Sequence, residues 1–345
     1  MFMRRLGWLG LAAVLAVSPL RGFGQTPVPP VPPVTSVPSV PSRDQEPPQP
    51  TVPQPTLQPQ PNGDQPTFTL GLRANLVDLT FSVTDKKGRF VTGLQLSNFG
   101  LLDDGRPPTS VVAFKQLTNL PLRVGIMLDT SSSIRTRFKF EQDSAVDFFL
   151  QVLHTNDRAF VEGFDVQTYI PQDYTQNIDL LDQGIRKLRP GGGTALYDSL
   201  YKTCRDQMLS LRNETAVRKA LILVSDGEDN YSRSGITDAI KMCQRAETIV
   251  YTISTDTSPT RGKGGDVLQA ISNATGGRTF FPNKMEDVAL GFRDIEAELR
   301  SQYSLEYRPA EFKQDGSFRT ILLRATDSRY QVRARTGYFA PRPEQ

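Results

Sequence analysis

Short apolar runs that alternate with amphipathic stretches constrain most strongly what this chain can fold into. The run Val124-Gly125-Ile126-Met127-Leu128 is typical of a strand buried on both faces. The stretch after it gathers apolar residues on one helical face, namely Phe140, Ala145, Phe148, Phe149 and Val152. The pattern continues with predicted strands at 159–164, 220–224, 249–253 and 279–281, and predicted helices at 180–188, 196–211, 236–245, 267–274 and 288–299. Alternation over about 180 residues predicts an α/β domain with a doubly wound, mainly parallel sheet.

Antiparallel β patterns flank this α/β stretch on both sides. Before it, 79–83 alternates apolar and polar residues, and 99–102 runs through Asp103-Asp104-Gly105 toward 110–114, which predicts a hairpin. After it, strands are predicted at 303–307, 318–323 and 330–335. We therefore predict that an α/β domain at 119–300 is inserted into one small β-sandwich, formed by 68–118 and 301–345. Two separate β elements are the alternative.

The first residues have the pattern of a secretory signal peptide at 1–24. Arg4 and Arg5 precede an apolar stretch at 6–17 that is too short to span a bilayer. The small residues Gly22 and Gly24 predict cleavage before Gln25, and an uncleaved anchor helix is the alternative. We therefore expect an exported protein, periplasmic or extracellular.

A proline tract follows at 25–67, with about 15 of the chain's 26 prolines. Such a composition is too poor in apolar residues to build a core, and it favours extended polyproline II backbone. At about 3.1 Å per residue, this tract can reach on the order of 120 Å. We interpret it as a disordered linker or spacer.

Charge and cysteine content exclude some classes of function. The net charge of +3 and the lack of a basic stripe with aromatic residues argue against nucleic-acid binding. Two cysteines and one histidine cannot supply the four such ligands of a structural zinc site. In an exported protein Cys204 and Cys243 can form a disulfide, and two free buried thiols fit the sequence equally well.

Polar residues concentrate where three predicted strands or loops lead into helices. The first group is Asp129-Thr130-Ser131-Ser132-Ser133, the second Gly191-Gly192-Gly193-Thr194, and the third Ser225-Asp226-Gly227-Glu228-Asp229. In an open α/β sheet, ligands bind beyond the carboxyl ends of the strands. Carboxylates and hydroxyls without histidine or thiolate suit a hard cation such as Mg²⁺.

Each group also has a purely structural reading. Ser131 or Ser133 can cap the next helix, the three glycines can form a flexible turn, and Asp226-Gly227 a tight one. The occurrence of all three groups together, in this order and at strand ends, favours a metal site instead. We predict that Ser131 and Ser133 bind the cation directly, that Asp129 and Asp226 hold coordinated waters, and that Thr194 binds from the opposite side.

This combination resembles the metal-ion-dependent adhesion site (MIDAS) of von Willebrand factor A (VWFA) domains, in which D-x-S-x-S is followed by a distant Thr and a distant Asp. The resemblance covers roughly 122–299 and implies a Rossmann-like fold. It further implies a Mg²⁺ ion, or Mn²⁺ or Ca²⁺, completed by an Asp or Glu of a ligand. The metal residues implied are Asp129, Ser131, Ser133, Thr194 and Asp226.

The chain is also similar to VWFA-related domain proteins of acidobacteria. The similarity rests on 83–88 (VTDKKG), on Asn98-Phe99 with Asp104-Gly105, and on 333–338 (RARTGY), and it extends the match to about 77–340. Ile134-Arg135 departs from the family pattern, where a small residue or Met is common, but it removes no metal ligand.

These observations predict an exported, non-enzymatic protein-binding module for adhesion or scaffolding, in which the metal recognises an acidic group of a partner protein. A metal-stabilised structural or envelope assembly factor is the alternative. A metal-dependent hydrolase fits less well, because Ser131 stands where a haloacid-dehalogenase phosphatase has a second Asp. A serine hydrolase would depend on His154, and no G-x-S-x-G elbow accompanies it.

Overall fold

A mostly parallel sheet forms the centre of the α/β domain. The computed structural model describes residues 75–117, 120–213, 217–258, 262–284 and 287–342. Within them the sheet has the strand order β6-β5-β4-β7-β8-β9, and only β6 runs antiparallel to its neighbour. The strands are β4 (Leu122–Asp129), β5 (Arg158–Phe164), β6 (Thr168–Thr175), β7 (Arg218–Ser225), β8 (Ile249–Ser254) and β9 (Thr279–Phe280). The predicted doubly wound α/β fold is confirmed.

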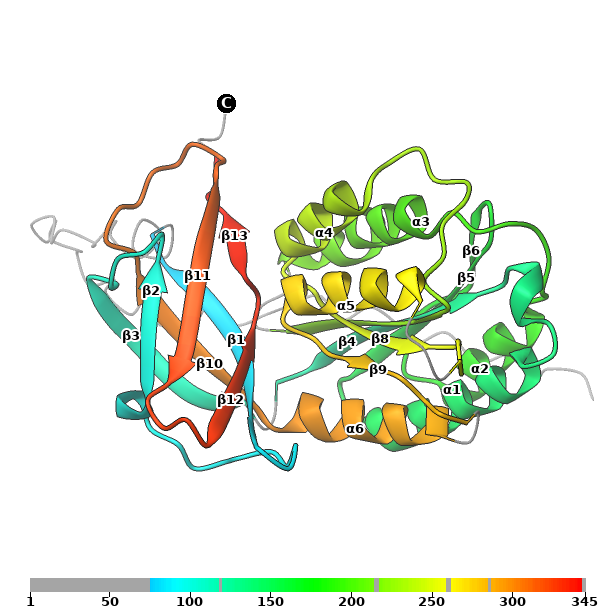
Figure 1. Cartoon of the computed structure of the whole chain (residues 1–345), viewed down its shortest axis with the longest axis horizontal. Helices are drawn as coiled ribbons and strands as arrows, with labels where there is room; N and C mark the ends of the chain where they lie inside the picture. The colour runs from blue at the N-terminus through cyan, green and yellow to red at the C-terminus, as the bar shows by residue number, and fades with distance from the viewer. Residues whose placement is uncertain (1–74, 118–119, 214–216, 259–261, 285–286, 343–345) are drawn as a thin grey trace, which may run out of the picture. The chain divides into compact units, whose positions relative to one another are not determined.

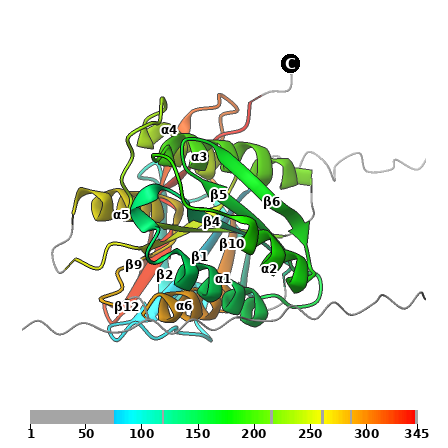
Figure 2. The same ribbon diagram turned by 90° about the vertical axis from the view of Figure 1, so that its right-hand side faces the viewer.

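Helices cover both faces of this sheet, as Figures 1 and 2 show. Because side chains alternate along a strand, Val124, Ile126 and Leu128 of β4 pack against one helical layer, whereas Met127 packs against the other. The first layer contains α1 (Phe138–Val152), α2 (Ile178–Lys187) and α6 (Val288–Arg300). The second contains α3 (Leu196–Thr203), α4 (Ile236–Arg245) and α5 (Lys263–Thr275).

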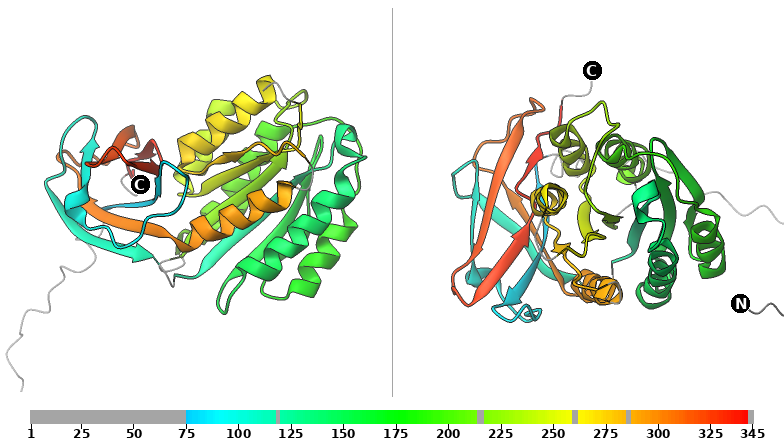
Figure 3. Two further views of the ribbon diagram at one scale, coloured as in Figure 1. Left: turned by 60° about the horizontal axis from the view of Figure 1, so that its bottom comes forward. Right: turned by 45° about the vertical axis from the view of Figure 1, so that its right-hand side comes forward.

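Strands from the two ends of the described chain pair with each other. One sheet has the order β12-β1-β10-β3 and the other β13-β11-β2, and a common apolar core lies between them. In Figure 3 the cyan N-terminal strands lie beside the orange and red C-terminal ones. The strands are β1 (Val77–Asp85), β2 (Phe99–Asp103), β3 (Ser110–Leu117), β10 (Gln302–Arg308), β11 (Phe318–Ala325), β12 (Tyr330–Ala334) and β13 (Gly337–Phe339). The predicted insertion into one sandwich is therefore correct.

The predicted hairpin between 99–102 and 110–114 is wrong. Strand β2 pairs with β11, and β3 pairs with β10 in the other sheet. Asp104 and Gly105 do make a turn, with φ of 45° and 76°, but pairing stops at a single bridge between Asp103 and Arg106. Pro107 and Pro108 follow, and proline has no N–H to donate to a β-ladder. The chain therefore leaves the sheet that contains β2 and enters the sheet that contains β3.

Two further details differ from the predicted elements. The sequence pattern predicted no strand at β6, whose Pro171 is tolerated because β6 lies at the edge of the sheet. The helix predicted at 196–211 is regular only to Thr203. It continues as a π-helical turn (Cys204–Met208) and a 3-10 helix (Leu209–Asn213).

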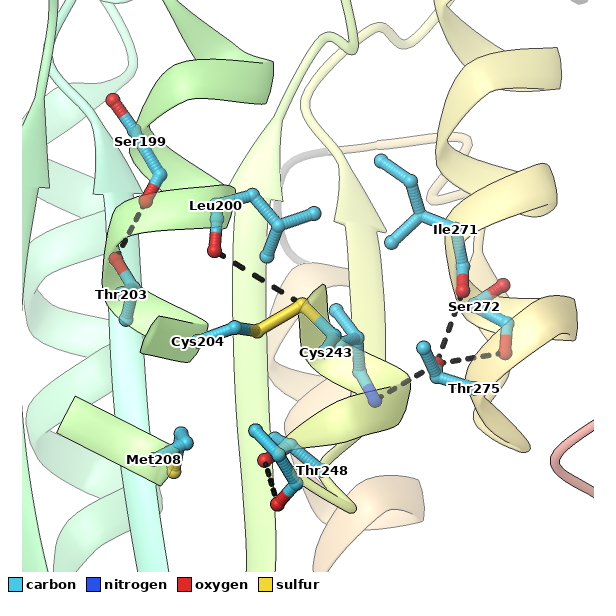
Figure 4. Close-up of a disulfide and its surroundings, with 12 residues drawn as sticks. Ser199, Leu200, Thr203, Cys204, Met208, Cys243, Thr248, Ile271, Ser272 and Thr275 are labelled. Atoms are coloured by element: carbon cyan, nitrogen blue, oxygen red, sulfur yellow. Dashed lines mark hydrogen bonds between the residues drawn. A yellow bond between two sulfur atoms is a disulfide. The ribbon is translucent and has the colours of Figure 1, made fainter. Parts of the chain in front are cut away.

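The two cysteines form a disulfide. The bond joins Cys204, at the start of the π-helical turn, to Cys243 of α4, and both residues are buried. Figure 4 shows it between the two helices, with Met208 and Leu200 nearby. Of the two states compatible with the sequence, the structure has the oxidised one.

The predicted signal peptide at 1–24 and the proline-rich linker at 25–67 lie outside the described residues. None of the helices in the described part of the chain combines the length and the apolar character that crossing a bilayer requires.

Candidate metal site

The predicted metal residues follow strands that are neighbours at the centre of the sheet. Strands β4 and β7 pair in parallel with Leu128 opposite Val224, so Asp129 and Ser225 come at the same edge. Helix α1 follows β4 and covers one face, whereas α4 follows β7 and covers the other. This is the topological switch point at which open α/β sheets bind ligands.

Asp129 anchors the first loop. Its side chain is fully buried, and its Oδ1 accepts a hydrogen bond from the Ser131 N–H at 2.8 Å. Its Oδ2 accepts one from the Ser225 hydroxyl at 2.7 Å, which links the ends of β4 and β7. Burial, with a smaller contribution from the negative charge of Asp226, raises the pKa of Asp129 to about 6, although these hydrogen bonds lower it.

The hydroxyls of Ser131 and Ser133 lie side by side and reach Asp226. Their Oγ atoms are 2.9 Å apart, and the Ser133 hydroxyl donates to Asp226 Oδ2 at 3.3 Å. Ser131 is buried, Ser133 is exposed, and Asp226 is half-buried. The group therefore extends from the buried strand end to the solvent.

Thr194 lies in a loop that is hydrogen bonded to both other loops. The Gly191 N–H donates to the Thr130 carbonyl oxygen at 2.6 Å, and the Ser132 N–H donates to the Gly192 carbonyl oxygen at 3.2 Å. On the other side, the Thr194 carbonyl oxygen accepts from the N–H groups of Asn230 and Tyr231. The Thr194 N–H donates to Asn230 Oδ1 at 2.9 Å.

Close packing explains two of the glycines in these loops. A Cβ atom on Gly193 would lie 2.1 Å from Cε2 of Tyr231, so the aromatic ring covers the backbone next to Thr194. Gly227 has φ of +82°, and a Cβ there would lie 2.2 Å from the Gly264 carbonyl oxygen at the start of α5. Both positions therefore favour glycine.

The structure thus brings Asp129, Ser131, Ser133 and Asp226 into one hydrogen-bonded group, with Thr194 held beside them through its backbone. Sequence reasoning assigned no role to Ser225 or Asn230, whose side chains hold Asp129 and Thr194. It also missed Glu141, an acidic residue on the core-facing side of α1. A carboxylate at a core position of an amphipathic helix was the signal available for it.

Negative charge accumulates at this edge of the sheet. Glu141 is fully buried, and burial raises its pKa to about 8. The negative charges of Asp129 and Asp226 contribute to this rise in pKa, and the charge of Arg137 opposes it. A bound cation would lower the cost of keeping these carboxylates ionised.

The side chains fit a hard divalent cation. Five oxygen-bearing groups, three hydroxyls and two carboxylates, come from three loops around one strand edge, and oxygen ligands are those that Mg²⁺ prefers. No group of three His, Cys, Asp or Glu side chains suited to a metal occurs within the described ranges. The residues therefore fit a site of the hydroxyl-and-carboxylate kind and not one built from acidic ligands alone.

The chain's histidine does not lie near the Ser131 hydroxyl. His154, the chain's one histidine, follows the C-terminal end of α1, whereas the Ser131 loop precedes the start of that helix. Fifteen helical residues separate the two ends, and at about 1.5 Å per residue this is on the order of 20 Å. His154 therefore cannot serve as a base for Ser131.

Comparison with known proteins identifies the domain. Residues 124–294, just under half of the chain, match the family model of the von Willebrand factor type A domain. No curated protein matches the sequence significantly.

Several solved structures resemble the chain at low identity. BatB of Bacteroides thetaiotaomicron is 15% identical with a TM-score of 0.43, over 52% of this chain and 100% of that one. The vWF domain of the type V pili tip protein Mfa5 of Porphyromonas gingivalis is 17% identical with a TM-score of 0.43, over 53% and 96%. The PilB minor pilin of Streptococcus sanguinis is 16% identical with a TM-score of 0.42, over 57% and 63%.

Proposed function

Since residues 124–294 form a von Willebrand factor type A domain, we propose that this chain is a protein-binding module that recognises its partner through a divalent cation. One observation carries the proposal. Asp129, Ser131, Ser133 and Asp226 form a continuous hydrogen-bonded group at the carboxyl ends of two central strands, and the group opens to solvent at Ser133.

The cation is Mg²⁺, or Mn²⁺ or Ca²⁺ in its place. The hydroxyls of Ser131, Ser133 and Thr194 hold it, and Asp129 and Asp226 hold its waters. Bound there, it supplies an electrophilic point for a carboxylate from outside. Asp129 is suited to the side of the cation that faces the protein interior, because its two oxygens already fix the loop through hydrogen bonds from Ser131 and Ser225.

The partner is a protein that offers an Asp or Glu side chain to the cation. Tyr231, whose side chain is 62% exposed, lies against Gly193 beside Thr194 and gives the partner an aromatic contact next to the metal. The role is adhesion or scaffolding outside the cytoplasm, after removal of the signal peptide at 1–24. We further propose that the chain is one of the VWFA-related proteins of acidobacteria, whose flanking motifs its own motifs resemble.

Cation binding tests the first step. In Asp226→Ala the half-buried carboxylate is lost, and we expect the affinity for Mn²⁺, measured by calorimetry, to fall by at least about tenfold. Glu228→Ala is the matched control, because Glu228 is an exposed acid of the same loop and should leave the affinity unchanged. Equal affinity in both variants would remove the metal site from the proposal.

Partner binding tests the second step. Proteins retained from native envelope extract by the wild-type chain in Mg²⁺ should be released by EDTA and should not be retained by Asp226→Ala. Retention that is indifferent to both treatments would show that binding occurs elsewhere on the chain.

A structural or envelope assembly factor is the second candidate. The backbone hydrogen bonds that join the three loops around Thr194 favour it, because a cation there would stabilise all three loops together. In that case chelation would lower the melting temperature of the chain and leave its interactions unchanged.

A further inference from the structure

Glu141 is buried in a way that packing does not explain. It lies in the first turn of α1, on the same side as Phe138, Ala145 and Phe148. Its side chain is 0% exposed, and within the described part of the chain neither carboxylate oxygen has a hydrogen-bond partner. A buried carboxylate without partners is among the most costly groups that a core can contain. A hydrocarbon side chain of similar size would serve packing better at this position.

Glu141 lies at the end of α1 that is nearest to the metal residues. The Cα–Cβ bonds of a helix tilt toward its N-terminus, so this side chain leans toward the loop that leaves β4. Both Asp129 and Asp226 act on it electrostatically. Three carboxylates therefore share one edge of the sheet.

The nearby positive charge is engaged elsewhere. Arg137, which precedes α1, donates a hydrogen bond to the carbonyl oxygen of Thr255 and forms no ion pair with Glu141 in the described residues. Thr255 follows β8, its N–H donates to the Ser225 carbonyl oxygen, and its own hydroxyl is buried without a partner. Two buried polar side chains without a partner in the described residues thus lie in α1, which follows β4, and just after β8, which pairs with β7. Ordered water or a cation with its waters is what such groups require.

We propose that Glu141 is a third acidic residue of the metal centre, whose carboxylate accepts hydrogen bonds from waters of the bound cation and adds negative charge to the site. The inference rests on the proposed metal site. Asp129 and Asp226 balance the two charges of the ion, so the charge of Glu141 is additional and increases the retention of the cation. Without the cation, the negative charges of Asp129 and Asp226 make ionisation of Glu141 less favourable.

This role predicts effects of opposite sign in one variant. Glu141→Gln keeps the shape and removes the charge. We expect it to bind Mn²⁺ about tenfold more weakly in calorimetry. Without metal it should melt at the same temperature as the wild type or higher, because the neutral amide avoids the unfavourable ionisation of a buried carboxyl group beside Asp129 and Asp226. The rise in melting temperature on adding Mn²⁺ should be smaller than in the wild type.

Glu162→Gln is the matched control. Glu162 is also a buried carboxyl group of the α/β domain, 1% exposed, but both its oxygens lie within hydrogen-bond distance of the Thr203 hydroxyl, on the opposite face of the sheet. Its replacement should leave the Mn²⁺ affinity unchanged. If Glu141→Gln does not fold, Glu141→Met, an apolar residue of similar length, is measured in the same way.

The outcomes separate the two proposals. If the wild type binds no cation, the proposed metal site fails and Glu141 loses this role with it. If the wild type binds Mn²⁺ and the Glu141 variant binds it equally well, only the role of Glu141 is overturned. A Glu141 variant that loses stability without metal and keeps the full Mn²⁺-dependent rise in melting temperature would show a purely structural carboxylate.

Discussion

The two faces of the central sheet differ in whether a buried carboxyl group has a hydrogen-bond partner among the described residues. On the face covered by α3, α4 and α5, Glu162 is hydrogen bonded to Thr203 at 2.7 and 2.8 Å, next to the disulfide of Cys204. On the face covered by α1, α2 and α6, Glu141 has no partner within the described residues. The first carboxyl group is satisfied by a hydrogen bond, whereas the second has none among the described residues and costs stability close to the candidate metal site. Buried charge that the fold leaves unsatisfied is therefore the better guide to function.

The largest expected effect on stability comes from removing the disulfide, which lies on the face of the sheet covered by α3, α4 and α5. Replacing Cys204 and Cys243 together by Ser opens a cross-link between residues 39 apart, and the free energy of unfolding should fall by about 3 kcal/mol in urea denaturation. The affinity for Mn²⁺ should change less than twofold. A large loss of affinity would mean that the disulfide on one face of the sheet affects the metal site and that the two faces are not independent.

A smaller effect concerns the pH dependence of Glu162. Burial raises its pKa to about 8 in the folded chain, from 4.5, so the folded state holds a proton that the unfolded state releases. Its contribution to stability is complete below about pH 4.5 and is lost as the pH rises through about 8. Lys202 and Asp206 are the charged groups that act on it.

The difference between wild type and Glu162→Gln isolates this contribution. The wild type should lose more stability than the variant between pH 5 and 8, with a slope difference of at most about 1.4 kcal/mol per pH unit. Unfolding in urea at a series of pH values measures it. Parallel pH profiles would indicate that Glu162 is ionised in the folded chain and that its burial is not as described.

The smallest expected effect is on the Mn²⁺ affinity when a glycine of the loop before Thr194 is replaced. Gly193→Ala places a methyl group against the Tyr231 ring, whereas a Cβ on Gly191 meets nothing within 4 Å. Because Tyr231 can move outward, we expect only a few-fold loss of Mn²⁺ affinity for Gly193→Ala and none for Gly191→Ala. Equal affinities would show that the position of Thr194 does not depend on this contact.

Much of the fold could be predicted from local patterns. The apolar run at β4 and the helical face of α1 depend on the period of the side chains, and both elements occur where they were predicted. The polar residues of the site were identified because strand ends at a switch point come together in any doubly wound sheet. Asp129 and Asp226 are therefore near each other although they are far apart in the sequence.

Other features could not be predicted because they depend on partners distant in the sequence. Strands β2 and β3 look like a hairpin, yet their partners, β11 and β10, lie about 200 residues further along the chain. Glu141 went unnoticed because the spacing of polar residues along a helix does not show whether a carboxylate on its core-facing side has a hydrogen-bond donor nearby. Only the packed structure shows that the described residues offer it no hydrogen-bond donor.

Anomalous diffraction from crystals of the chain grown in MnCl₂ would locate the proposed cation. We expect a single strong anomalous peak among the side chains of Ser131, Ser133 and Thr194, with Asp129, Asp226 and Glu141 around it. Crystals that diffract well and show no peak at the carboxyl ends of β4 and β7, or a peak at another place on the chain, would contradict this expectation.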